Sequence, residues 1–156
     1  MSEEAAPQQG QVRLERIYLK DSSFESPSAP EVFTEAWQPE VSVDINTRSN
    51  AVDDTRVEVV LTVTVRAKRA SGKTGFIVEV QQAGLFVITG LDGPTKQQAL
   101  GTVCPATLFP YLREAVDNLV VKGGFPALQL APVNFEALFA AAVAEHRAAS
   151  EEAPKH

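Results

Sequence analysis

Few residues in this sequence have side chains that could perform chemistry. Cys104 is the only cysteine, and it could act as a nucleophile if a base lay beside it. The two histidines, His146 and His156, lie near the C-terminus, and neither has a second ligand at metal-site spacing. No histidine is close to Cys104 in sequence. We therefore expect Cys104 to behave as a small buried hydrophobic residue. The alternative that the fold brings a catalytic partner close to Cys104 stays open.

Two further motifs resemble functional sites but are better explained as turns. Residues 71–75, SGKTG, end like a phosphate-binding loop, yet that motif needs a glycine where this chain has Ala67 and a helix where a strand pattern follows. Asp53 and Asp54 form a carboxylate pair in a segment of turn composition. The sequence therefore predicts no catalytic residue, no cofactor and no metal site.

A long β-hairpin over residues 55–90 is the element around which the chain is organised. Apolar residues occupy every second position of its first strand, which predicts one buried face. The other face is mixed, because Val60, Thr62 and Thr64 are β-branched and weakly polar, so a second subunit could cover it. The predicted turn is residues 69–75, and Gly84 is expected to interrupt the second strand.

The remaining segments predict two more strands, then helices. The first strand, residues 11–24, should alternate strictly and place Leu14 and Tyr18 on one face and Ile17 on the other. A further strand follows around residues 41–46. Helices are expected over residues 95–103 and 107–122, with Pro105 between them, and from Asn134 to Ser150. This order predicts an α+β fold: a four-stranded antiparallel sheet, in a meander or a Greek key, with helices packed on one face.

Domain organisation and location follow from length and composition. The 156 residues fit one domain, expected at residues 11–148, with a disordered N-terminus at 1–10 and a mobile charged tail at 149–156. The net charge of −6 argues against nucleic-acid or anionic-membrane partners. The chain has no apolar run long enough to span a membrane, and its N-terminus does not have the composition of a signal peptide. We expect a soluble cytoplasmic protein.

Two surface features suggest binding. Between residues 21 and 58 the chain has nine acidic and only two basic residues, which either forms a solvated surface or steers a basic partner. Large apolar residues also lie outside the predicted elements, and they either fill the core or line a groove. These residues are Phe33, Trp37, Phe125, Leu128 and Leu130.

Five blocks of sequence, in one order and with matching spacing, resemble the SecB protein-export chaperones of Gram-negative bacteria. The likeness covers residues 11–147. The blocks are RIYLKDSSFESPSAP (16–30), WQPEV (37–41), EVQQAGLF (79–86), CPATLFPYLREAV (104–116) and GGFPALQLAPVNFEALF (123–139). The resemblance implies an ATP-independent chaperone, not an enzyme, that holds presecretory polypeptides unfolded and delivers them to the translocation motor SecA. It also implies a homotetramer built as a dimer of dimers.

Family roles carry over to individual residues only as expectations. The surface that docks the basic, zinc-bearing tail of SecA is expected at Asp21, Glu25, Ile77 and Glu79. The dimer–dimer contact is expected at Val78, Val80 and Gln82. The groove for unfolded clients is expected at Phe33, Trp37, Phe76, Leu128, Leu130 and Leu138, with ordinary core as the alternative for each.

Two alternative functions stay open at this point. A SecB-like chaperone dedicated to a toxin–antitoxin system would share the same blocks, and its gene neighbourhood would distinguish it. A small-molecule-binding or enzymatic α+β domain that uses Cys104 belongs to a different class, and an activity lost on Cys104→Ser would identify it.

Overall fold

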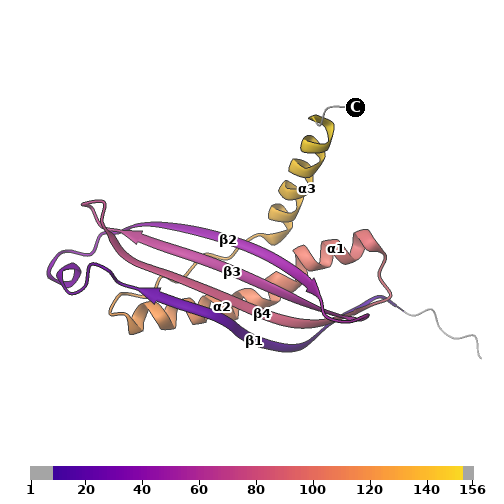
Figure 1. Cartoon of the computed structure of the whole chain (residues 1–156), viewed down its shortest axis with the longest axis horizontal. Helices are drawn as coiled ribbons and strands as arrows, with labels where there is room; N and C mark the ends of the chain where they lie inside the picture. Colours follow the sequence, from indigo (N-terminus) through magenta and orange to yellow (C-terminus); the bar gives the residue numbers. More distant parts are fainter. Residues whose placement is uncertain (1–8, 153–156) are drawn as a thin grey trace, which may run out of the picture.

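The computed structural model describes residues 9–152 and contains one sheet with helices on one side (Figure 1). The termini that we expected to be disordered lie largely outside the described residues, at 1–8 and 153–156. The strands are β1 (Gln11–Glu25), β2 (Glu40–Ala51), β3 (Arg56–Lys68) and β4 (Thr74–Thr89). The helices are the short 3₁₀ helix η1 (Glu31–Thr34), α1 (Gly93–Gly101), α2 (Val103–Lys122) and α3 (Phe135–Glu152). The predicted α+β class is confirmed.

The sheet has the strand order β1-β4-β3-β2, and all neighbouring strands are antiparallel. Successive hairpins join β2, β3 and β4, and β1 lies beside β4, so the topology is a Greek key. The connection from β1 to β2 therefore crosses from one edge of the sheet to the other. Ser26 and Ser28 anchor it by donating hydrogen bonds from their hydroxyls to the carbonyls of Gly75 and Thr74, at 3.3 and 2.6 Å.

Strand β1 does not alternate as strictly as the sequence predicted. Its register against β4 shifts between Leu14 and Arg16, and again between Leu19 and Asp21. Each bulge adds one residue to β1 and moves the following side chain to the other face. Ile17 therefore packs on the core together with Leu14, whereas Tyr18 faces away, which corrects the predicted assignment of faces.

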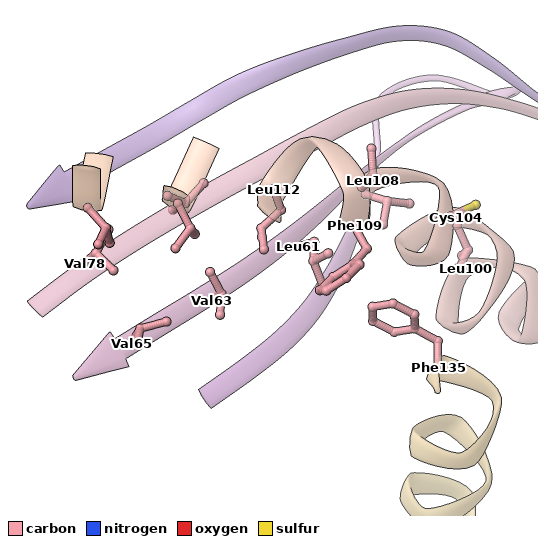
Figure 2. Packing of buried hydrophobic residues seen from close by; sticks show 14 of the residues in the cluster. Leu61, Val63, Val65, Val78, Leu100, Cys104, Leu108, Phe109, Leu112 and Phe135 are labelled. Atoms are coloured by element: carbon pink, nitrogen blue, oxygen red, sulfur yellow. The ribbon is translucent and has the colours of Figure 1, made fainter. Parts of the chain in front are cut away.

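Helix α2 covers the centre of the sheet and closes the core. Its apolar stripe packs on the alternate residues of β3 and β4, whose side chains are fully buried (Figure 2). The buried stripe of α2 consists of Cys104, Leu108, Phe109, Leu112, Val116 and Val120. Gly84 does not interrupt β4: a β-carbon there would lie 2.7 Å from the Phe86 ring and 2.9 Å from Leu108. The glycine therefore permits α2 to approach the strand closely.

The helix boundaries differ from the predicted ones for a physical reason. Pro105 was expected to separate two helices, but it lies in the first turn of α2, where the missing N–H has no intrahelical acceptor in any case. The break instead falls at Thr102, with φ −125° and ψ −76°. Residues 149–152, expected in a mobile tail, continue α3 as helix.

Candidate binding surfaces

Cys104 is not part of a reactive site. Its side chain has no solvent exposure, and burial raises the pKa of the thiol to about 12. Figure 2 shows it within the hydrophobic packing between α2 and its neighbours, and His146 is an exposed residue of α3. The expectation that Cys104 is a buried hydrophobic residue is confirmed.

Cys104 is expected to react with a thiol reagent only when the protein unfolds. A pKa of about 12 leaves about one thiol in 10⁵ ionised at pH 7, and the buried sulfur is also inaccessible. Stopped-flow reaction with a chromogenic disulfide, with and without urea, measures this directly. Reaction of the native protein at the rate of a free cysteine would contradict the buried placement.

The two motifs interpreted as turns are turns. Residues 69–73 close the β3–β4 hairpin, with Gly72 at φ 84° donating its N–H to the Arg69 carbonyl. Asp53 accepts hydrogen bonds from the Arg56 side chain and from the backbone N–H groups of Thr55 and Arg56. These bonds, led by the Arg56 guanidinium, lower the pKa of Asp53 to about 2. Over residues 9–152 no three acidic, histidine or cysteine side chains are grouped to hold a metal ion.

The four residues expected to dock SecA lie together on the sheet face opposite α2. In the β1–β4 ladder Glu25 pairs with Ile77, Ser23 with Glu79, and Asp21 with Gln81. Paired residues of an antiparallel ladder point to the same face, so the carboxylates of Asp21, Glu25 and Glu79 share one surface. None of these three forms an ion pair within the described chain. We call Asp21, Glu25, Ile77 and Glu79 the acidic face.

A polar network beside the acidic face was missed by the sequence reasoning. Tyr18 donates a hydrogen bond from its hydroxyl to Glu58, and Lys20 forms an ion pair with the same carboxylate at 2.7 Å. Lys20 and then Tyr18 lower the pKa of Glu58, while burial and Glu58 raise the pKa of Tyr18 to about 12. Sequence alternation could not predict the network, because the bulge after Leu14 is what turns Tyr18 to this face.

The residues expected at a dimer–dimer contact lie inside the subunit. Val78 and Val80 have no exposed surface and pack beneath α2 (Figure 2 labels Val78). Gln82 is 6% exposed, and its side-chain amide donates to the carbonyl of Tyr18 at 3.1 Å. A second chain cannot touch Val78 or Val80 while α2 stays in place. The expectation of a direct contact is therefore corrected: these residues support α2.

Five aromatic side chains gather where the β1–β2 connection meets the end of α2. They come from segments far apart in sequence, and each ring lies within 6.3 Å of another, centroid to centroid. This aromatic cluster consists of Phe24, Phe33, Trp37, Phe76 and Phe125. Phe33 is 52% exposed and Trp37 is partly exposed, whereas Phe76 has no exposed surface. Phe76 is thus core and does not line a groove.

Strand β2 exposes apolar side chains on the side of the sheet that bears the helices. Val41 and Val43 share a face with the buried residues Ala67 and Val65 of β3, yet they are 42% and 43% exposed. The reason is that α2 packs on β4 and β3 and leaves the β2 edge uncovered. The sequence reasoning missed these valines, because alternation alone does not tell how far a helix reaches.

The predicted groove residues do not all lie together. Leu128 and Leu130 are partly buried against the core in the loop between α2 and α3. Leu138 instead lies in a pocket of about 390 Å³ that is bounded by β2, α1 and α3 and is also lined by Ile45 and Phe135. Phe33 and Trp37 of the aromatic cluster precede β2 in sequence, and the lining of this pocket begins at Ile45, in the middle of β2. Val41 and Val43 lie between them in sequence along the strand. We call Trp37, Val41, Val43, Ile45 and Leu138 the apolar edge.

The fold and these surfaces define an α+β binding protein with an apolar edge and an acidic face. A family model described as "Preprotein translocase subunit SecB" matches residues 5–146. A protein-export protein SecB from Pseudomonas paraeruginosa is 54% identical over 147 residues, which cover 94% of this chain and 90% of that protein. Its counterpart in Hahella chejuensis is 55% identical over the full length of both. The chain belongs to the SecB family, and this confirms the resemblance inferred from sequence.

A solved structure supports the fold independently. The Mycobacterium tuberculosis SecB-like chaperone Rv1957, in complex with a ChAD peptide from the HigA1 antitoxin, aligns with a TM-score of 0.66 at 19% identity. The alignment covers 79% of this chain and 91% of that one. In addition, no helix within residues 9–152 has the length and apolar character that a membrane span requires.

Proposed function

We propose that this protein is an ATP-independent chaperone that holds presecretory polypeptides unfolded and delivers them to SecA. The observation that carries the proposal is the apolar edge, since a soluble subunit leaves valines exposed on the helix side of its sheet. Burial of such surface contributes about 25 cal/mol per Å², whatever the client sequence. A binder of many unfolded chains needs this kind of unspecific contact.

The geometry of β2 suits an extended client. All residues of β2 pair with β3 without a register shift, and no other strand of the described chain pairs with β2, so its outer backbone groups form a regular edge. A client segment could add to that edge by backbone hydrogen bonds and place alternate side chains on the apolar edge. Strand β1, the other edge, carries two bulges that interrupt such a ladder.

The acidic face supplies a separate surface for the delivery step. Its carboxylates form no ion pair within residues 9–152, and they lie on the sheet face opposite the helices. The client and a basic, zinc-bearing tail of SecA would therefore bind at the same time without competing for one surface. Assembly into a tetramer would give one long client several weak sites, whose affinities combine through effective concentration. This function places the protein in the cytoplasm and requires no catalysis.

Client binding is expected to weaken about tenfold in Val43→Asp. Loss of one valine side chain that a bound client covers removes about 1.5 kcal/mol of binding free energy, which corresponds to about one decade in Kd. The probe is reduced, carboxymethylated ribonuclease A, a permanently unfolded chain without tryptophan, titrated by calorimetry. Emission from Trp37, the only tryptophan, should change in the same titration.

The matched control is Val52→Asp. Val52 is 58% exposed and lies outside the apolar edge, in the turn after β2, so its replacement should leave the Kd unchanged. Equal binding by the wild type and Val43→Asp, with no change in Trp37 emission, would remove the apolar edge from the proposal.

A dedicated toxin–antitoxin chaperone is the second candidate. The peptide from an antitoxin bound to the Mycobacterium tuberculosis neighbour favours it, but that protein is only 19% identical. The relatives at 54% and 55% identity are protein-export proteins, which favours the export function. An antitoxin gene beside this one would reverse that preference.

A further inference from the structure

The α2–α3 loop, residues 123–134, joins the two apolar areas of the helix side. It begins beside Phe125, a member of the aromatic cluster, and it ends at Phe135, which lines the pocket with Leu138. Along the way it presents Leu128, Leu130 and Val133, all partly buried against the core. The position of this loop therefore decides how much apolar surface lies between the cluster and the pocket.

One carboxylate holds the middle of this loop. Oδ1 of Asp117, on α2, accepts hydrogen bonds from the backbone N–H groups of Leu128 at 3.0 Å and Gln129 at 3.2 Å. No other hydrogen bond of the part of the chain that the structure describes reaches residues 126–133. The next anchors lie at the two ends: the Phe125 N–H donates to the Val120 carbonyl, and Asn134 caps α3 through Ala137.

The backbone at the point of attachment has an unfavourable conformation. Gln129 has φ 50°, and it is the only residue with a side chain that adopts a positive φ among residues 9–152. A left-handed conformation is unfavourable for such a residue and persists where the surroundings impose it. Two consecutive N–H groups that converge on one carboxylate oxygen provide that constraint, because charge-assisted hydrogen bonds are stronger than neutral ones.

We propose that Asp117 is a positioning residue for client binding: it latches the α2–α3 loop to α2 and so sets the place of Leu128 and Leu130 on the client surface. The inference rests on the proposed function. It assigns an indirect role to Asp117, which itself contacts no client side chain. Without the two hydrogen bonds to Asp117, Leu128, Leu130 and Val133 would still pack against the core, but the middle of the loop would have no hydrogen bond to α2. Leu128 and Leu130 would then sample several positions, and a client would have to order the loop when it binds.

The test uses full-length Asp117→Ala, with Asp117→Asn as the conservative variant and Glu114→Ala as the matched control. Glu114 is an exposed acid of the same helix, and its side chain forms no hydrogen bond or ion pair within the described residues. Amide hydrogen exchange of Leu128 and Gln129 is expected to accelerate about tenfold in Asp117→Ala. It should accelerate less in Asp117→Asn, whose amide oxygen still accepts both bonds.

The second readout separates positioning from a purely structural role. At a temperature well below unfolding, the Kd for reduced, carboxymethylated ribonuclease A should rise about fivefold in Asp117→Ala, recover partly in Asp117→Asn and stay unchanged in Glu114→Ala. Faster amide exchange with an unchanged Kd would overturn the positioning role. Exchange equal to that of Glu114→Ala would overturn the latch. Failure of the wild type to bind the probe would overturn the proposed function, and the role in client binding with it, while the exchange rates still decide the latch.

Discussion

Val78→Asp is expected to destabilise the folded subunit strongly and not merely to divide a tetramer into dimers. Val78 has no exposed surface and lies beneath α2, opposite Phe24 and Val65 in the β-ladders (Figure 2). An aspartate there buries a carboxylate without a partner and removes apolar packing, at a cost of about 4 kcal/mol or more. A domain of this kind has about 5–15 kcal/mol in total, so the substitution should remove between about a quarter and most of the stability of the subunit.

The control for this variant is Val43→Asp, which makes the same change on the same side of the sheet. Because Val43 is 43% exposed, its aspartate stays hydrated, and the loss in the free energy of unfolding should stay near 1 kcal/mol. Urea denaturation followed by circular dichroism compares the two, and light scattering gives the mass of any folded species. A folded Val78→Asp dimer with wild-type stability would show that α2 leaves the sheet on assembly and would restore the direct contact predicted from sequence.

Glu79→Lys is expected to weaken SecA binding about tenfold or more at low salt. Glu79 lies on the acidic face with Asp21 and Glu25, and Thr64 donates a hydrogen bond to it at 3.2 Å. Reversal of its charge turns an attraction into a repulsion for each basic side chain nearby, at roughly 1 kcal/mol per pair. Two such pairs exceed the 1.4 kcal/mol that corresponds to one decade in affinity.

The measurement is calorimetry with purified SecA at 50 mM and 500 mM salt. The deficit of Glu79→Lys should shrink at the higher salt, because exposed charges are then screened. Glu114→Lys serves as the matched control, since it makes the same charge change on α2, on the other side of the sheet. An equal loss in both variants would indicate an effect of net charge, and the acidic face would no longer be the docking site.

The sequence predicted the order and type of the main elements, but not all of their bounds or the faces that they bury: β2 covers Glu40–Ala51, where the pattern indicated a strand around residues 41–46. Alternation in residues 57–67 predicted β3 correctly, and the glycine at the hairpin tip marked its turn. The bulges in β1 were not predictable, because Glu15 and Lys20 carry no signal that they are the added residues. The role of Gly84 was not predictable for a related reason, since the close approach of the Phe86 ring and of Leu108 explains a glycine within a continuous strand.

The candidate surfaces were predictable to different degrees. Asp21, Glu25, Ile77 and Glu79 came from the resemblance, and the ladder brings them to one face. Phe33, Trp37, Leu128 and Leu130 were recognised as apolar residues outside regular elements, which needs no tertiary information. Burial of Val78 and Phe76, by contrast, depends on which sheet face α2 covers. Packing across the whole domain determines which face α2 covers, and no local sequence pattern predicts it.

The Greek-key order has a consequence for how the chain folds as it leaves the ribosome. Tyr18 in β1 and Gln82 in β4 are joined by a hydrogen bond but lie 64 residues apart in sequence. At roughly 5–20 residues per second, β1 would wait about 3–13 s for its neighbour to be synthesised. During that interval Ile17 and Phe24 have no sheet to pack on. A chaperone that binds other unfolded chains therefore passes through an unpaired state of its own, and we expect the rate of synthesis between β1 and β4 to affect its yield.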